Sequence, residues 1–344
     1  MAPLMIARSS IQCLNRGAKL VLTDMSGIEL DHDYSRKFHL LRPQLIDGNG
    51  IRYDNFIKTL KPNYARIYLD ITLGYAALII TMVAVTLAPH RGLLVVCGAV
   101  SVGFWIAYLQ LFIHEGAHFN FSAEKEKSDF LCNIFIAWLI GTSVQQYRAV
   151  HFQHHRALGR TDDSEASYFF PLNIVFLAKA MFGVRVIEIL TSRKAITDRP
   201  KTTGDGKKVG IVGIAAHACI VFVAYLCGGL WSSTAWIFGV VMFFPLFGAL
   251  RQLLEHRDPH SDSATNYFDN DHGAYTRMFG SDLFSSIFGG AGFNRHLLHH
   301  WEPQVSYTNL PQLEAYLLQT EAAPLIEMRR SSYFGTFASL FRIL

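Results

Sequence analysis

Eight of the 15 histidines of this 344-residue chain lie in three short clusters, at residues 114–118, 151–155 and 296–300. The histidines are spaced i, i+4 in the first cluster and i, i+3, i+4 in the other two. On a helix, these spacings place the side chains on one face, one turn apart. Eight imidazoles exceed the four ligands of a tetrahedral zinc site, so the pattern favours two metal ions. The clustered histidines are His114, His118, His151, His154, His155, His296, His299 and His300.

Composition indicates that membrane helices position these clusters. Apolar residues make up 51% of the chain and charged residues only 17%, which is more apolar and less charged than an average soluble domain. Four uncharged runs, residues 71–88, 92–113, 209–230 and 234–250, are each about long enough to cross a hydrocarbon core roughly 30 Å thick. The net charge of +4 gives no indication of a nucleic-acid partner.

The four runs occur in two pairs with short connections. Residues 89–91 join the first pair and residues 231–233 join the second, so each pair is expected to form a tight transmembrane hairpin. Both connections then face one side of the membrane. Nearly all lysines and arginines lie in the segments on the other side, which the positive-inside rule identifies as cytoplasmic. Those segments are residues 1–70, 114–208 and 251–344.

The sequence therefore predicts an all-α, multi-pass integral membrane protein. Two transmembrane helical hairpins (four spans) are expected to support a helical cytosolic cap, which carries the histidine clusters on the cytoplasmic side. The predicted organisation is an N-terminal cytosolic segment (1–66), a membrane domain (67–320) and a C-terminal cytosolic tail (321–344). The five cysteines include no CxxC pair and three lie in predicted spans, so they are expected to be reduced packing residues.

A ninth candidate ligand is His256, which follows the fourth apolar run by six residues. Six residues are about 9 Å of helix, which places His256 at the membrane depth of the first cluster. An all-nitrogen shell that keeps open positions suits redox-active iron, because O₂ must reach the metal. Some acidic residues near the clusters are expected to accept the second ring N–H of a ligand histidine. These acidic residues are Glu115, Asp162, Asp163, Glu165, Glu255, Asp258 and Glu302.

With these boxes, the chain resembles the membrane fatty acid desaturase family, whose members carry HxxxH, HxxHH and HxxHH boxes in this order. The resemblance covers roughly residues 65–320. The three boxes together, at matching membrane depth, are a specific signal, whereas one box alone is not. Residues beside the boxes also resemble the family, namely Asn133, Tyr147, Arg148, Gly159, Asp162, Asp163, Trp301, Glu302, Pro303, Tyr307, Leu310 and Pro311.

The resemblance implies a diiron centre (Fe²⁺/Fe³⁺) with O₂ as co-substrate. It implies insertion of a double bond, or of a hydroxyl, at an unactivated C–H position of a lipid acyl chain. Carried over residue by residue, His114 and His118 match the first box, His151, His154 and His155 the second, His296, His299 and His300 the third, and His256 the additional histidine after the last span.

Departures from the family pattern narrow the expected substrates and the expected electron donor. The first box has only three intervening residues, which disfavours free acyl-CoA as the substrate, and the third box begins with His296 where front-end desaturases have glutamine. The chain contains no His-Pro-Gly-Gly haem motif, so a separate donor is expected, either a ferredoxin or a cytochrome b5 with its reductase. Arginines beside the boxes are expected to attract an acidic carrier. They are Arg148, Arg156, Arg160, Arg257 and Arg295.

Several alternatives remain open. Residues 114–118 also match HExxH, the zinc peptidase motif, although that hypothesis leaves six clustered histidines unexplained. Within the family, a hydroxylase or ketolase, or a desaturase of a small amphiphilic metabolite, would use the same boxes. A non-catalytic metal-binding or lipid-sensing membrane protein is a third class. His217 lies inside the third apolar run, where it either lines a substrate cavity or is a hydrogen-bonded packing residue.

Overall fold

The computed structural model describes residues 34–88, 91–195, 204–258 and 275–341, and these belong to one compact unit that begins at His32. The described residues contain helices and no strand, apart from two isolated β-bridges, so the prediction of an all-α protein is confirmed. The predicted division at residues 66 and 320 stays a prediction.

Two long apolar helices pack side by side, α3 (Tyr64–Leu87) and α4 (Arg91–Ala117). A third long segment follows, made of α10 (Gly204–Phe238), the π-helical η5 (Gly239–Phe243) and α11 (Phe244–His256). Within the described residues, three helices are long and apolar enough to cross a membrane, and they are Tyr64–Leu87, Gly92–Ala117 and Lys207–His256. This finding, by length and composition, identifies a membrane protein.

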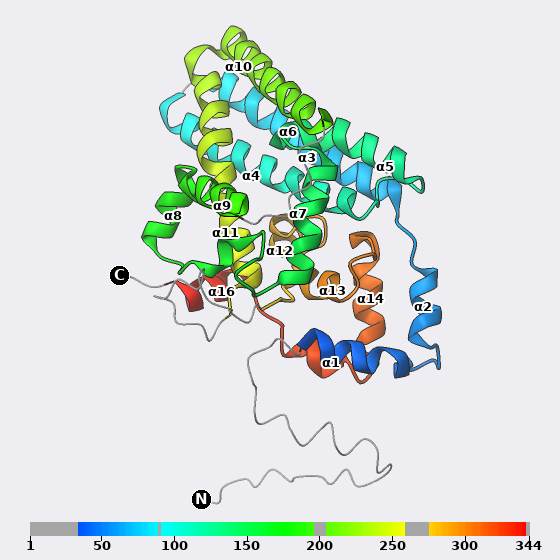
Figure 1. Cartoon of the computed structure of the whole chain (residues 1–344). Coiled ribbons are helices and arrows are strands. Elements are labelled where there is room, and N and C mark those ends of the chain that lie inside the picture. The colour runs from blue at the N-terminus through cyan, green and yellow to red at the C-terminus, as the bar shows by residue number, and fades with distance from the viewer. Residues whose placement is uncertain (1–33, 89–90, 196–203, 259–274, 342–344) are drawn as a thin grey trace, which may run out of the picture. The chain divides into compact units, whose positions relative to one another are not determined.

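The third candidate span changes direction inside its length. It contains 50 residues, or about 75 Å if it were one straight helix, which is far more than a bilayer core. Gly229 has φ 68° and ψ −157°, a conformation that is essentially restricted to glycine, and Figure 1 shows the turn at the end of the first part of α10. The predicted connection at residues 231–233 is wrong, because these residues are helical and Ser232 and Ser233 are buried.

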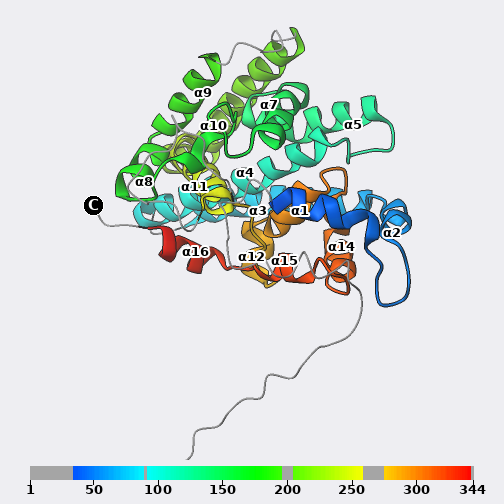
Figure 2. The same ribbon diagram turned by 60° about the horizontal axis from the view of Figure 1, so that its bottom comes forward.

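The remaining helices surround the long ones in Figures 1 and 2. α8 and α9 lie beside α11, and α1 contacts α13 through Phe38, whose ring stacks on Trp301 with centroids 4.1 Å apart. The bounds are α1 Tyr34–Leu41, η2 Arg42–Gln44, α2 Tyr53–Thr59, α5 Lys125–Cys132, η3 Asn133–Ala137, α6 Trp138–Ile140, α7 Val144–Ala157, η4 Ala166–Phe169, α8 Ile174–Met181, α9 Val184–Ala195, α12 Leu283–Phe288, η6 Phe293–Arg295, α13 His296–Trp301, η7 Tyr307–Asn309, α14 Leu310–Leu317, α15 Ala323–Glu327 and α16 Tyr333–Leu340.

Buried apolar clusters join these helices, and three of them are large. The largest includes Ile71 from α3, Ile106 and Phe112 from α4, and Trp236 from the second part of α10. A second cluster joins residues 38–60 to the helices after the third histidine box, and a third joins α8, α11 and α16. The apolar residues of the third box, Leu297, Leu298 and Trp301, are therefore buried against the N-terminal helices.

Gly229→Ala is expected to lower stability by about 1–3 kcal/mol, because alanine rarely adopts the backbone conformation of the turn. The measurement is the thermal unfolding midpoint of the purified chain in detergent. Gly92→Ala is the matched control, since a Cβ at Gly92 would meet no atom within 4 Å. Equal midpoints for the two variants would contradict a glycine-dependent turn.

Candidate metal centre

Four helices bring the nine predicted ligand histidines into one region of the protein. His114 lies in the last turn of α4, and His118 follows that helix with its N–H donating to the His114 carbonyl oxygen at 3.3 Å. His256 is the last residue of α11. The other six lie on α7 and α13 and are His151, His154, His155, His296, His299 and His300.

Close packing at the end of α4 fixes the first box. A Cβ on Gly116 would lie 2.3 Å from the Cys132 Sγ, so only glycine allows α4 to approach this buried cysteine. Arg148 of α7 donates through Nε to the Ala117 carbonyl oxygen at 2.7 Å and through Nη2 to that of Gly116 at 3.0 Å. These carbonyls have no partner within the helix, so Arg148 caps α4 and joins it to α7.

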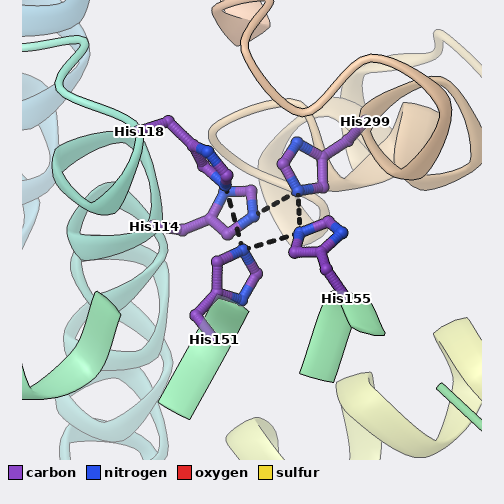
Figure 3. A group of neighbouring side chains, drawn as sticks. All are labelled: His114, His118, His151, His155 and His299. Atoms are coloured by element: carbon purple, nitrogen blue, oxygen red, sulfur yellow. Dashed lines mark hydrogen bonds between the residues drawn. The ribbon is translucent and has the colours of Figure 1, made fainter. Parts of the chain in front are cut away.

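The nine histidines form two groups of ring nitrogens. In each group the candidate ligand atoms lie within 4.8 Å of one another. The first group is drawn in Figure 3, where its rings point toward one another from α4, α7 and α13. The first group is His114, His118, His151, His155 and His299, and the second is His154, His256, His296 and His300.

Each HxxHH box divides its histidines between the two groups. On α7, His151 and His155 belong to the first group and His154 to the second. On α13 the assignment is reversed, because the i, i+4 pair, His296 and His300, belongs to the second group and the i+3 residue, His299, to the first. At 3.6 residues per turn, position i+4 lies about 40° to one side of position i and position i+3 about 60° to the other. One helical turn therefore presents ligands to two neighbouring sites.

The Nε2 atoms of the first group form a chain of short contacts, drawn as dashed lines in Figure 3. The His114 and His299 Nε2 atoms are 2.8 Å apart, and the His299 and His155 atoms 2.9 Å. From His155 the chain continues to His151 at 2.9 Å and to His118 at 3.1 Å. In the second group, the Nε2 separations are 3.2, 2.8 and 3.2 Å.

These distances fit nitrogens around a metal ion. The Nε2 of a neutral imidazole carries either one N–H or one lone pair, so an Nε2 that faces two others can form a hydrogen bond with only one of them. With metal–nitrogen bonds of about 2.1 Å, adjacent nitrogens lie roughly 3.0 Å apart at right angles and roughly 3.4 Å apart at tetrahedral angles. The observed 2.8–3.2 Å lie close to these separations, so the spacing of the nitrogens suits an ion bound by several imidazoles. Imidazole donors suit iron, copper, nickel and zinc.

Burial keeps most of the rings in the form that binds metals. It lowers the pKa of five histidines, and neighbouring positive groups lower it further. Their imidazoles are therefore neutral at pH 7, with a lone pair free for an ion. The five are His118, His155, His296, His299 and His300.

Two acidic residues orient histidines of α7. The Nδ1 of His154 lies 2.9 Å from Asp163 Oδ2, and Tyr168 donates its hydroxyl to the same carboxylate. Burial lowers the pKa of His154, but the carboxylates of Asp163 and Glu165 outweigh it and raise the pKa to about 9. Without a metal ion His154 holds a proton on each nitrogen, and an ion would displace the one on Nε2. The His151 Nδ1 lies 3.5 Å from Glu165 Oε1.

Glu115 has a structural environment that disfavours the zinc peptidase hypothesis. Its carboxylate is 2% exposed and accepts hydrogen bonds from the Ser306 hydroxyl at 2.9 Å and from the Tyr307 N–H at 3.3 Å. A general base in HExxH must instead face a metal-bound water. Glu115 therefore connects the first box to the segment after the third. Glu302 is likewise engaged elsewhere, since it accepts the Tyr53 hydroxyl.

The five arginines predicted to attract an electron carrier do not form one exposed surface. Arg257 is fully buried, and its Nη1 donates to three consecutive carbonyl oxygens. Arg148 and Arg295 are partly buried and hold ion pairs. Arg156 and Arg160 are exposed. Arg257 therefore cannot contribute to a landing surface, and docking of an electron carrier beside the boxes stays a prediction.

A cavity of about 1350 Å³ reaches the histidines from between α7, α9, α10 and α11. His154, His256 and His296 of the second group line it, together with apolar side chains from the long helices. His217 lines it as well, with its Nε2 3.0 Å from the Leu139 carbonyl oxygen and its Nδ1 accepting from the Trp236 indole at 3.2 Å. His217 thus combines both predicted roles, because it faces the cavity and is fully hydrogen-bonded.

Comparison with known proteins adds one match. A family model described as fatty acid desaturase matches residues 60–332, which include all nine histidines. A separate comparison with curated proteins found no match.

Disrupting one group is expected to remove one metal ion and leave the other. His118→Ala changes only the first group and His300→Ala only the second, so each variant should keep about half of the wild-type metal, given that a lost ligand commonly costs 10–100-fold in affinity. The measurement is elemental analysis of anaerobically purified, monodisperse protein. His39→Ala, at an exposed histidine, is the control with full metal content. Full retention in both ligand variants would contradict the two-group arrangement.

Proposed function

The chain belongs to the fatty acid desaturase family, and from this premise we propose that it is an O₂-dependent desaturase that introduces a double bond into a lipid acyl chain at a diiron centre. Family membership implies an oxidoreductase. One observation supports the diiron proposal most strongly, namely the division of nine histidines into two groups with opposed Nε2 atoms. The all-nitrogen donor set suits iron that must also accept O₂.

Each histidine group would hold one iron ion. Two iron ions would supply the redox chemistry with O₂ that C–H oxidation requires. The protein's own residues bind and orient the reactants. Asp163 accepts the Nδ1–H of His154 and so orients the ring with Nε2 toward the other histidines, where an ion would displace the Nε2 proton. Glu115 holds the Tyr307 segment against α4 and so fixes the third box relative to the first.

The cavity supports a long-chain substrate over a small metabolite. Its volume of about 1350 Å³ exceeds the 300–1,000 Å³ typical of sites for drug-sized ligands. Leu111, Phe244 and Phe293 line it beside the histidines, so an acyl chain would exclude water from the region where oxidation occurs. A hydroxylase or ketolase would use the same arrangement, and the product distinguishes them.

We further propose four spans and a separate electron donor. The turn at Gly229 divides the third candidate span into two helices, each about long enough to cross a bilayer core. All nine histidines then lie on one side, which the distribution of lysines and arginines indicates is cytoplasmic. A ferredoxin, or a cytochrome b5 with its reductase, would approach the boxes from that side.

Lipid profiling of cells that express the intact chain tests the desaturase proposal. Wild-type protein is expected to produce an acyl product lacking two hydrogens, and only when O₂ is present. His154→Ala is expected to reduce product at least 10–100-fold, because a metal ligand is lost, whereas the exposed His39→Ala is the active control. A product that gains one oxygen would identify a hydroxylase. Product formed equally by wild type and His154→Ala would refute catalysis at this centre.

Cysteine labelling tests the four-span topology. Three natural cysteines are exposed, Cys97, Cys219 and Cys227, so the background must lack all natural cysteines. A single cysteine at the exposed Leu230 is expected to react with an impermeant reagent from outside the cell, because Leu230 follows the proposed turn. Cysteine at the exposed Lys127 should react only after permeabilisation. Reaction of both positions from the same side would contradict the second hairpin.

A further inference from the structure

The cavity has a charged wall that the metal-binding arrangement does not use. This wall comes from α9 and the end of α7, and it carries Arg185, Arg156 and Arg160. None of these three belongs to either histidine group. They lie on the same cavity as three of the four histidines of the second group, so a substrate that fills the cavity would contact both.

Arg185 is the buried cation of this wall. Its residue is 5% exposed, and its guanidinium lies over the Phe170 ring at 3.8 Å from the centroid. Its Nη1 is 2.5 Å from Glu188 Oε2, while its Nε has no hydrogen-bond partner among the described residues. A buried N–H without a partner is costly. Arg185 therefore offers a fixed donor to a ligand in the cavity.

Charged groups of both signs line the cavity, namely Arg156, Arg160, Arg185 and Arg251 together with Asp162, Glu165 and Glu255. Glu188 pairs with both Arg185 and Lys179, so one carboxylate serves two cations. Arg160 pairs with Asp162, but Arg156 makes no ion pair with a described residue. Arg156 and the Nε of Arg185 are therefore the cationic groups that can receive an anionic group of a ligand, and guanidinium suits the planar, multidentate recognition of carboxylate or phosphate.

The helices that border the cavity expose apolar side chains. Ile214 of α10 and Val186 of α9 line the cavity and are 74% and 40% exposed. Ile187 and Leu190 of α9 are 62% and 47% exposed. Exposed apolar residues of this extent next to a candidate span suit contact with lipid. A ligand that enters here from the bilayer would be an amphiphile, with its chain in the apolar part of the cavity.

We propose that this cavity binds an amphiphile with an anionic head, phosphate or carboxylate, and that Arg185 holds the head with Arg156 at its side. The inference rests on the proposed function in one respect only, namely that the acyl chain beside the histidines is oxidised. It adds that an anionic head, not the chain alone, selects the substrate.

Three radiolabelled ligands with one shared chain test the proposal on the intact protein. Oleate carries a carboxylate, oleyl phosphate a phosphate, and oleyl alcohol a neutral head. Equilibrium binding to the purified full chain in nonionic detergent, at a pH where both acids are ionised, is expected to favour one or both anions over the alcohol by at least 10-fold. The anion that binds more tightly identifies the source, a free fatty acid or a lipid phosphate.

Variants assign the preference to one residue. Arg185→Gln is expected to weaken binding of the preferred anion roughly 10- to 100-fold, as hydrogen bonds to charged groups commonly do, and to leave oleyl alcohol unchanged. Lys179→Gln is the matched control, because Lys179 pairs with the same Glu188 but does not line the cavity. Arg185→Lys keeps the charge, and should keep part of the preference even where Arg185→Gln does not fold.

Two results would overturn the proposal. One is oleyl alcohol that binds the wild-type protein as tightly as both anions, and the other is a loss in Lys179→Gln as large as in Arg185→Gln. Binding needs no turnover, so the result is separate from the desaturase proposal. Selective binding of an anion by a chain that oxidises no lipid would refute the desaturase proposal and leave the anionic subsite. Normal desaturation by a protein that shows no preference for an anion would refute the anionic subsite and leave the desaturase proposal.

Discussion

The structure depends on one electrostatic constraint, the close approach of nine imidazoles whose Nε2 atoms face one another at 2.8–3.2 Å. An Nε2 that faces two others leaves one contact without a donor–acceptor pair unless a cation lies between the rings, and water is largely excluded because most of these rings are buried. Four helices must therefore be held in register to keep the rings this close. The rest of the packing holds the histidine-bearing helices in these positions.

Polar contacts supply much of this register. Glu115 accepts from the Tyr307 N–H, and the Tyr307 hydroxyl donates to Asp70 of α3 at 2.8 Å. A single residue after the third box is thus joined to both α3 and α4. Arg148 joins α7 to the end of α4. Buried polar networks of this kind specify one arrangement, because a shift of any helix leaves a polar group without a partner.

The sequence predicted those features that depend on the spacing of residues along one helix or on the length of one apolar run. The i, i+3, i+4 spacings predicted three helical clusters, and the apolar runs predicted α3, α4 and the third long segment. The acidic partners could not be selected, because the choice of Asp163 over Glu302 depends on contacts that the loop after α7 makes with His154. The connection between the third and fourth runs was predicted at residues 231–233, slightly too late in the chain. The turn lies at Gly229, because its φ of 68° suits glycine and the polar residues 231–233 are helical.

The histidine groups and the charged wall would contact different parts of a substrate, the acyl chain and the head group. The histidine groups recognise no part of an acyl chain, since methylene groups offer them neither charge nor hydrogen bonds. Selection of one carbon along a uniform chain therefore needs a fixed point elsewhere, and the apolar wall cannot provide it because dispersion contacts change little when a chain slides. A guanidinium held by Phe170 and Glu188 is such a fixed point. With the head bound there, the oxidised position would be counted from the head group, and the length of cavity between Arg185 and the histidines would set which carbon is reached.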